Sequence, residues 1–273
     1  MLEETRPTGN GRARGLVSSR ESGRRVEAHT FAPGPAMRDL VECYWTTCWD
    51  LTGQPPHRVE VLADPCATLA LEAGRSRVVG VSTRLFTRQL EGAGLIRAAK
   101  LRAGAARAFL AGPLARLTDR VVPLAEELPR LPAGLERAVL QPGDDAEGLE
   151  ALEGWLAAVA DRRSVPLAGL AARLMEQVEL DPELASAAEL AARARLSLRQ
   201  LQKLFKDQVG ITPRWALRRR RLQEAALRLE RGKGPTLAEL AAELGYADHA
   251  HLTRDFRAAT GRTPSSFARD ARR

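Results

Sequence analysis

The last third of this chain contains an internal repeat, which limits the folds open to it more than any other feature. Residues 188–192 and 238–242 both read Ala-Glu-Leu-Ala-Ala, an offset of fifty residues. Farther along the offset becomes 51, because the second copy has one extra residue in a turn. The matched pairs there are Ser197 with Asp248, Leu201 with Leu252, Phe205 with Phe256, Lys206 with Arg257, Gly210 with Gly261, Thr212 with Thr263 and Pro213 with Pro264. Such self-similarity predicts two copies of one small structural unit.

Each copy has the pattern of a helix-turn-helix unit. A short helix rich in Ala and Leu is followed by a tight turn and a second helix. Ser197 with Gln200 has the spacing of a capping box, in which two side chains satisfy backbone N–H groups at a helix start. Thr236 with Glu239 has the same spacing. The pattern therefore predicts two helix-turn-helix units.

One long helix is expected between the two copies. It begins at Pro213, since proline is favoured at the first position of a helix, and ends near Glu230. As a rod, it would hold the two second helices about one DNA turn, ~34 Å, apart. It contains the run Arg218–Arg221, which turns through about 300° and cannot face one phosphate strand as a whole. We expect one or two of these arginines to contact phosphate or pair with Glu224, and the others to lie in solvent.

The second helix of each copy has an apolar face and a polar face. The apolar residues, expected in the core of each unit, are Leu201, Leu204 and Phe205, and Leu252 and Phe256. The polar faces carry Arg199, Gln202, Lys203 and Lys206 in the first copy, and His249, Thr253, Arg254 and Arg257 in the second. These side chains suit phosphates and purine edges. The solvent-exposed face of an ordinary helical bundle has a similar pattern. The distribution of charge along the chain has to distinguish this possibility from a DNA-binding face.

The positive charge is confined to the same part of the chain. The net charge is +8, and residues 181–273 contain 19 Lys and Arg against 11 Asp and Glu, whereas the first 180 residues contain 23 of each kind. The whole excess therefore lies around the repeat. This distribution predicts that the C-terminal region binds a polyanion and favours DNA over a solvated bundle.

Over the whole chain, the sequence pattern predicts an α+β fold, with a β-rich N-terminal part and a helical C-terminal part. Residues 1–28 are rich in Gly, Arg and Ser and predict a disordered tail. Residues 31–128 have short apolar runs between turn signals, which are typical of a β-rich domain. Residues 144–181 have the apolar spacing of a helical connector, and residues 183–270 predict an all-α domain. The expected strands cover 40–49, 58–62, 67–71, 77–81 and 94–101.

Residues 183–270 resemble the DNA-binding region of the arabinose-operon-activator (AraC/XylS) family of transcriptional regulators. The resemblance is strongest at Gly245-Tyr246, Leu252-Thr253-Arg254, Phe256-Arg257, Gly261, Thr263-Pro264 and Phe267. It implies two helix-turn-helix units joined by a long helix, and a protein that regulates transcription by binding specific DNA sequences. Our hypothesis is that this regulator is an activator. More weakly, residues 36–128 resemble the N-terminal domain of one branch of these regulators, which implies a sensing or dimerisation role for residues 31–128.

By this resemblance, the residues that read DNA bases are Arg199, Gln202, Lys203, His249, Ala250 and Arg254. We assign phosphate contacts to Ser197, Lys206, Thr253 and Arg257. Ala250 departs from the family pattern, because its side chain offers no hydrogen bond and can only touch a thymine methyl group. The second unit is therefore expected to read fewer bases and to rely more on phosphates.

The resemblance implies promoter DNA as the partner of this chain. Further candidates are RNA polymerase, a small-molecule effector at the N-terminal domain and a second copy of the chain in a homodimer. We expect no cofactor and no bound metal. We also expect no membrane partner, since no apolar run approaches the ~20 residues that span a bilayer, and a cytoplasmic location.

Two other functions stay open at this point. A non-specific architectural DNA-binding protein would carry the same basic surface. A cysteine-based DNA-alkylation repair transferase or sensor would use Cys66 or Cys43. Together with Cys48 these are three cysteines, one fewer than a four-cysteine zinc site needs, so we expect them as small core residues. The sequence has no phosphate-binding loop and no nucleophile elbow, and we expect no enzyme.

Overall fold

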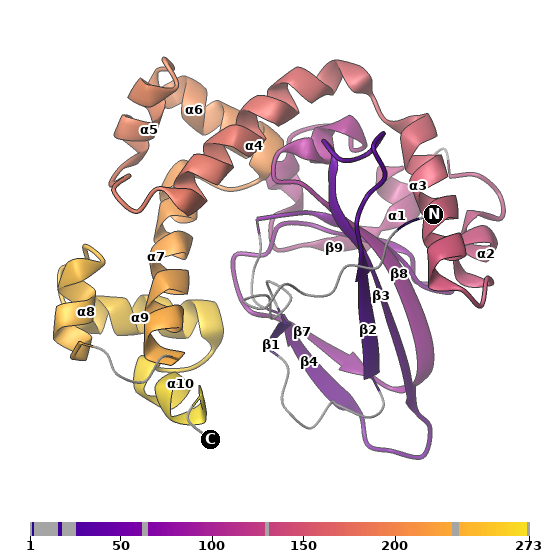
Figure 1. The fold of residues 1–273 in the computed structure, drawn as a ribbon, viewed down its shortest axis with the longest axis horizontal. Helices are drawn as coiled ribbons and strands as arrows, with labels where there is room; N and C mark the ends of the chain where they lie inside the picture. The colour runs from indigo at the N-terminus through magenta and orange to yellow at the C-terminus, as the bar shows by residue number, and fades with distance from the viewer. Residues whose placement is uncertain are drawn as a thin grey trace.

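The computed structural model describes residues 2, 16–17, 26–61, 65–128, 131–230 and 235–271. Its N-terminal part is rich in β-strands and its C-terminal part is helical (Figure 1). The larger sheet has six strands in the order β2-β3-β8-β5-β6-β9, and neighbouring strands run antiparallel. Its strands are β2 (Val26–Phe31), β3 (Val41–Leu51), β8 (Gly92–Leu101), β5 (Thr68–Leu71), β6 (Arg77–Val79) and β9 (Val121–Pro123). A smaller sheet consists of β1 (Leu16–Val17), β4 (His57–Val61) and β7 (Phe86–Leu90).

The central strand pair β3 and β8 divides its side chains between two apolar layers. Tyr44 and Ala99 are register partners and lie in the main core, on the side of the helices. Trp49 and Ala98 belong to a separate cluster that also includes Leu90 of the smaller sheet. This division follows from the two-residue period of a strand, which sends successive side chains to opposite faces.

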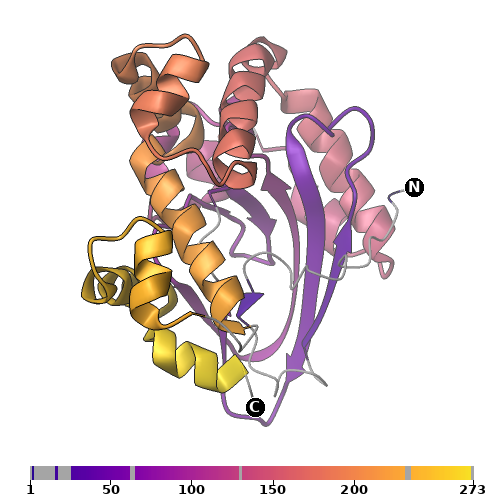
Figure 2. The same cartoon turned by 60° about the vertical axis from the view of Figure 1, so that its left-hand side comes forward.

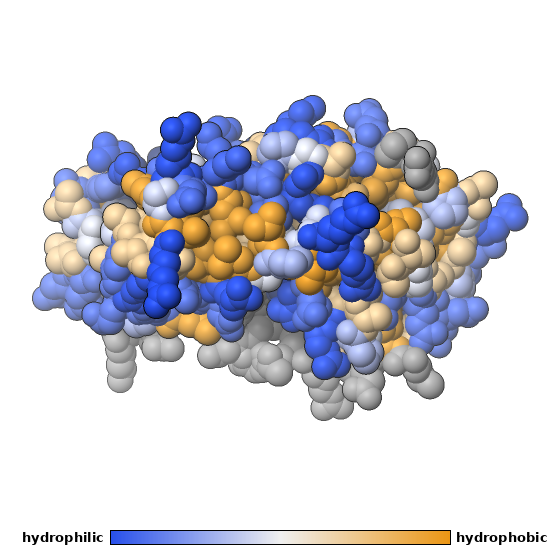
Figure 3. All heavy atoms as spheres, turned by 90° about the horizontal axis from the view of Figure 1, so that it is seen from above, coloured by the Kyte–Doolittle hydropathy of each residue, from blue (hydrophilic) through white to orange (hydrophobic). Residues whose placement is uncertain are grey.

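Among the described residues, four α-helices lie between the sheets and the repeat: α1 (Leu124–Glu127), α2 (Leu135–Leu140), α3 (Asp145–Val159) and α4 (Val165–Leu180). The first three pack against strands of the larger sheet, whereas α4 packs against the 3₁₀ helix η2 (Ala105–Ala108) and against the repeat region. Asp144 caps α3, because its carboxylate accepts a hydrogen bond from the backbone N–H of Ala146. The face that carries α4 exposes an apolar area bordered by hydrophilic side chains (Figure 3). Leu167 of α4 is one of the exposed large hydrophobic residues.

The repeat region forms two short helix pairs on either side of one long helix. The elements are α5 (Ala187–Arg193), α6 (Leu198–Leu204), the wide π-type turn η5 (Phe205–Val209), α7 (Pro213–Glu230), α8 (Leu237–Glu243), α9 (His249–Thr260) and α10 (Pro264–Ala271). Both expected capping boxes are present, Ser197 with Gln200 and Thr236 with Glu239. Figure 2 shows α7 running from the α4–α6 end of the helical part to its α8–α10 end.

Apart from the cluster around Trp49, the described residues form two hydrophobic cores, whose boundary differs from the domain boundary expected from the sequence. One core extends from the sheets through α3 and α4 into the first helix pair, and it includes Leu201, Phe205 and Leu217. The second core is small and joins the end of α7 to α8, α9 and α10, with Leu222 and Phe256 among its members. The first helix pair therefore packs as part of the N-terminal body.

Several expectations from the sequence are confirmed, and one is corrected. All five expected strands are present, and the helix expected from Pro213 to Glu230 has these bounds. The expectation of a disordered tail over residues 1–28 falls mostly outside the described residues. Where residues are described, it is wrong, because Leu16–Val17 form β1 and the segment from Val26 begins β2. Pairing with β4 and β3 supplies the backbone hydrogen bonds that these segments lack alone. In the described part of the chain, no helix is both long and apolar enough to cross a lipid bilayer.

Candidate nucleic-acid interface

Helix α6 presents the first group of predicted DNA contacts. Leu201 and Phe205 are buried, so the remaining face of the helix is turned outward. The outward side chains are those of Arg199, Gln202 and Lys203 of α6 and of Lys206 in η5, which continues α6, and all four are exposed. They share one face because they follow the three- and four-residue spacing of a helix. Among the described residues, these four side chains have no hydrogen-bond or ion-pair partner and are available to a ligand.

Helix α9 presents the second group in the same way. Asp248 caps the helix, because its carboxylate accepts a hydrogen bond from the backbone N–H of His251 at 2.6 Å. This bond holds the pKa of the Asp248 carboxyl below its ordinary value. Leu252 and Phe256 are buried in the second core. Of the predicted contacts, His249, Ala250, Arg254 and Arg257 are exposed and Thr253 is half-buried.

The two outward faces are equivalent in the repeat. At the offset of 51 residues, Arg199 matches Ala250, Gln202 matches Thr253, Lys203 matches Arg254 and Lys206 matches Arg257. The fold thus brings the predicted residues together in two sets, each at the same place on its helix pair. The last two positions of each set are basic, as a phosphate-binding surface requires.

Ser197 has a structural contact that competes with its predicted role. Its hydroxyl donates to the side-chain oxygen of Gln200 at 2.9 Å and accepts from the Gln200 backbone N–H at 3.2 Å. The same Gln200 oxygen accepts from the Ser197 backbone N–H. A phosphate contact through the Ser197 hydroxyl would have to replace or share these bonds.

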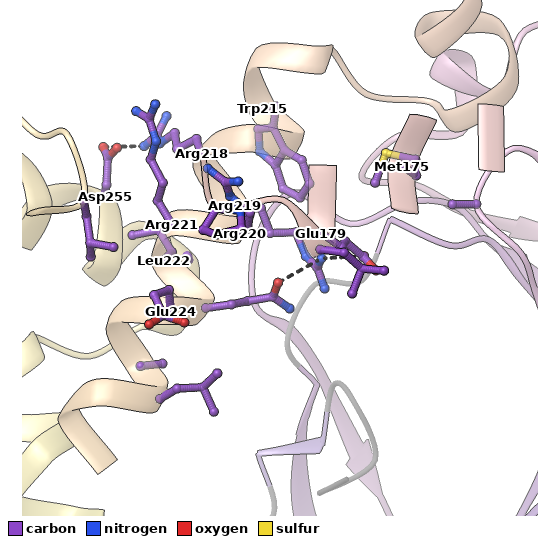
Figure 4. A pocket seen from close by; sticks show the side chains of 18 of the residues that line it. Met175, Glu179, Trp215, Arg218, Arg219, Arg220, Arg221, Leu222, Glu224 and Asp255 are labelled. Carbon is purple, nitrogen blue, oxygen red and sulfur yellow. Dashed lines mark hydrogen bonds and ion pairs between the residues drawn. The ribbon is translucent and has the colours of Figure 1, made fainter. Parts of the chain in front are cut away.

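The arginine run of α7 differs from its expected role. Arg218 pairs with Asp255, and Arg219 lies 3.6 Å from a carboxylate oxygen of Glu179 (Figure 4). Arg220 donates to the backbone carbonyls of Asp181 and Leu184, and Arg221 donates to that of Ala185. The carboxylate of Glu224 pairs instead with Arg228, one helical turn later, at 2.6 Å. The expectation of pairing with Glu224 is therefore wrong, since all four arginines have other partners within the protein. Arg218 is also exposed to solvent, as expected for part of the run, and phosphate contact stays a prediction.

Asp255 is a residue of this region that sequence reasoning missed. It is buried in α9, where its carboxylate pairs with Arg218, and the ring of His251 lies 3.7 Å away. The sequence contains a signal, because Asp255 occupies the position of Leu204 in the first copy. An acidic residue at a core position of a repeat indicates a buried partner of opposite charge.

The turn after α6 attaches the first helix pair to the N-terminal body. Gly210 is buried with a φ of +87°, and its carbonyl accepts a hydrogen bond from the Thr118 hydroxyl. A Cβ atom at Gly210 would lie 3.1 Å from Cγ of Leu114 and 3.4 Å from Val81. In the preceding turn, Asp207 lies 3.8 Å from Nε of Arg107. The turn around Gly210 therefore packs closely against residues of the N-terminal body.

Gly210→Ala is expected to lower the free energy of unfolding by about 2–4 kcal/mol. Alanine at this φ is strained by ~1 kcal/mol or more, and the close contact with Leu114 adds a packing cost of roughly the same size. Gly134→Ala is the matched control, since Gly134 also has a φ of +87° but an added Cβ would meet nothing within 4 Å. Urea unfolding measures both variants. Equal losses would mean that the contact with the N-terminal body contributes no stability.

The cysteines do not all lie where the sequence predicts. Cys43 and Cys66 are half-buried, but Cys48 is exposed on β3, so the expectation of three core residues is wrong for Cys48. Partial burial and the neighbouring carboxylate of Glu27 raise the pKa of the Cys48 thiol. The Cys66 thiol donates to Glu42 at 3.5 Å. Within the described ranges, no group of three or more His, Cys, Asp or Glu is arranged to hold a metal ion.

Comparison with known families matches two parts of the chain. Residues 190–270 match the family model "Helix-turn-helix domain". Residues 29–123 match a "Domain of unknown function (DUF6597)". The first match covers α6, α7, α8 and α9, and therefore both exposed faces described above.

Comparison with individual proteins gives relatives of the same kind. The HTH-type transcriptional activator RhaS of Pectobacterium carotovorum subsp. carotovorum (strain PC1) is 30% identical over 129 residues. The matched stretch is 47% of this chain and 38% of RhaS, so the chain spans well under half the length of this relative.

Solved structures give the following similarities. A probable AraC family transcriptional regulator from Rhodopseudomonas palustris CGA009 is 29% identical, with 36% of this chain and 93% of that chain covered and a TM-score of 0.34. ToxT from Vibrio cholerae is 9% identical, with 89% and 97% covered and a TM-score of 0.38.

The helical C-terminal part thus carries a duplicated helix pair, a basic exposed face on each pair and the match to a helix-turn-helix family model. RhaS, the relative described above, is an HTH-type transcriptional activator. On these observations the C-terminal part of this chain is similar to the helix-turn-helix domains of DNA-binding transcriptional regulators.

Proposed function

We propose that this chain is a sequence-specific transcriptional activator that reads two successive major grooves of promoter DNA. In this proposal the pairs α5/α6 and α8/α9 act as helix-turn-helix units, joined by α7, and α6 and α9 enter the grooves. The observation that carries the proposal is the pair of exposed faces at equivalent repeat positions, which include Lys203 and Arg254. The activating role is supported by the likeness to RhaS, a transcriptional activator.

The proposal gives the exposed side chains two kinds of role. Arg199, Gln202, Lys203, His249, Ala250 and Arg254 read bases. Ser197, Lys206, Thr253 and Arg257 contact phosphates. Exposure of nearly all of these residues supports this assignment, because side chains that contact DNA have to be accessible at the protein surface. Thr253 and Ser197 fit least well, since one is half-buried and the other caps α6.

We further propose that the N-terminal part controls DNA binding. The proposed domains are a sensing or dimerisation domain over residues 31–128, a helical connector over 144–181 and the DNA-binding domain over 183–270. The first helix pair shares a hydrophobic core with the N-terminal part, so a change in one has a direct route to the other. Near the second pair, a Cβ at Gly261 would lie 3.3 Å from Leu85 of the N-terminal part.

The proposed partners follow from these roles. An effector bound by the N-terminal part would act through the shared core on the first helix pair. RNA polymerase is the proposed protein partner, since an activator has to act on it. A homodimer is compatible with the proposal but not required, because one chain carries both helix pairs.

The test is selection of bound sequences from a random duplex pool by the full chain at two salt concentrations. We expect enrichment of two short motifs about one helical turn apart, and weaker binding at the higher salt concentration because phosphate contacts release counterions. Salt-sensitive binding without an enriched motif would contradict sequence-specific reading and indicate an architectural DNA-binding protein. Absence of binding at both concentrations, with and without a cell extract as a source of effector, would contradict the proposal as a whole.

A further inference from the structure

The run Arg218–Arg221 lies where α7 passes from one hydrophobic core to the other. Ala216 and Leu217, just before the run, belong to the first core. Leu222 and Ala225, just after it, belong to the second. A groove of about 2190 Å³ borders this stretch, and all four arginines line it. Between the two cores, α7 is therefore held by polar contacts.

The first two arginines contact helices on different sides of α7. Arg218 pairs with Asp255 of α9, in the second helix pair. Arg219 lies 3.6 Å from Glu179 near the end of α4, in the first core's part of the molecule. Successive residues of a helix point about 100° apart, which explains why neighbouring arginines reach different helices (Figure 4).

The other two arginines contact the segment between α4 and α5. Arg220 donates to the carbonyls of Asp181 and Leu184, the second at 3.1 Å. Arg221 donates to the carbonyl of Ala185 at 2.9 Å. The guanidinium of Arg221 also lies beside the turn between α8 and α9, because a Cβ at Gly245 would be 3.8 Å from its central carbon. The run thus contacts residues before the first helix pair and residues within the second.

We propose that Arg218–Arg221 are positioning residues that fix the orientation of the second helix pair relative to the first and thereby set the spacing between the two DNA motifs. This inference rests on the proposed function. The forked geometry of guanidinium groups suits the role, since Arg220 can donate to two carbonyls at once. Because each of these arginines contacts a neighbouring segment of the protein, we infer that they contribute to DNA binding through geometry.

The double variant R220K/R221K tests this inference because it keeps both positive charges. A lysine ammonium on a flexible stem cannot reproduce the forked contact. The probes are duplexes that carry the two motifs enriched by the wild-type chain, at the enriched spacing and with one to five base pairs inserted, together with duplexes that carry one motif. R163K is the matched control, since Arg163 is exposed in the connector, outside both helix pairs.

For the wild type and R163K, we expect insertions to weaken binding at least tenfold, because only one spacing allows both helix pairs to bind together. For R220K/R221K, we expect affinity at the enriched spacing to fall roughly tenfold and the preference for that spacing to shrink to a few-fold. Affinity for single-motif duplexes should stay unchanged. If the double variant fails to unfold cooperatively on heating, R221K alone replaces it, with the same direction of change expected.

Two results would overturn the inference. One is an unchanged spacing preference in the lysine variants. The other is an equal loss of affinity on single-motif and two-motif duplexes, which would make the arginines phosphate contacts. If the wild-type chain itself enriches no pair of motifs, the proposed function fails, and this outcome is distinguishable because it appears before any variant is made.

Discussion

Asp145→Ala is expected to lower the free energy of unfolding by about 3–5 kcal/mol, because it leaves the buried guanidinium of Arg97 without its counter-charge. Arg97 is 2% exposed on β8. It donates to Asp145 through Nε at 3.1 Å and Nη2 at 2.8 Å, and to the carbonyls of Val139 and Pro142 through Nη1. Thr46 donates to the other oxygen of the same carboxylate at 2.7 Å. The pair joins the sheet to the start of α3.

Glu147→Ala is the control for this prediction. Glu147 is an exposed acid in the same first turn of α3, so both substitutions remove a negative charge from the helix N-terminus. Urea unfolding gives the free energy of unfolding of both variants, and the difference between them measures the contribution of the pairing with Arg97. The double variant R97M/D145A should recover part of the loss, since it leaves no unpaired buried charge. A loss for Asp145→Ala within 1 kcal/mol of the control would contradict the account of this pair.

Arg254→Ala and Lys203→Ala are each expected to weaken binding to the selected duplex by about 1–3 kcal/mol, roughly 5- to 150-fold. The two residues lie on separate helices, so their losses should add in the double variant. Arg163→Ala is the control for the loss of one positive charge far from the proposed grooves. Fluorescence anisotropy on the selected duplex and on a scrambled duplex measures the effect. An equal loss on both duplexes would assign these residues to phosphates.

The helices of the C-terminal part could be predicted closely from the sequence. The repeat fixed where the two copies begin, and capping residues such as Ser197 and Thr236 fixed where helices start, because caps act locally. Strand β3 and its partner β8 were also predictable, since short apolar runs between turn signals favour strands. By contrast, β7 was missed, since it contains the polar run Thr87-Arg88-Gln89 and owes its conformation to pairing with β4.

The contacts that organise the candidate site could not be predicted in the same way. The spacing of Arg218–Arg221 correctly predicted that the four side chains point in different directions, but their partners come from α4, α9 and the segment before α5. These contacts depend on the packing of distant segments, which local periodicity does not contain. The attachment of the first helix pair to the N-terminal core depends likewise on Gly210 meeting Leu114 across about a hundred residues of sequence.

We propose that each helix pair reads its own DNA motif. The most direct test repeats the selection from a random duplex pool with Lys203→Ala and with Arg254→Ala separately, beside the wild-type chain. We predict that each variant loses sequence preference in one motif only, that the two variants affect different motifs, and that the other motif and the spacing stay as in the wild type. If both variants change the same motif, or weaken both motifs equally, the claim that α6 and α9 read separate motifs is wrong.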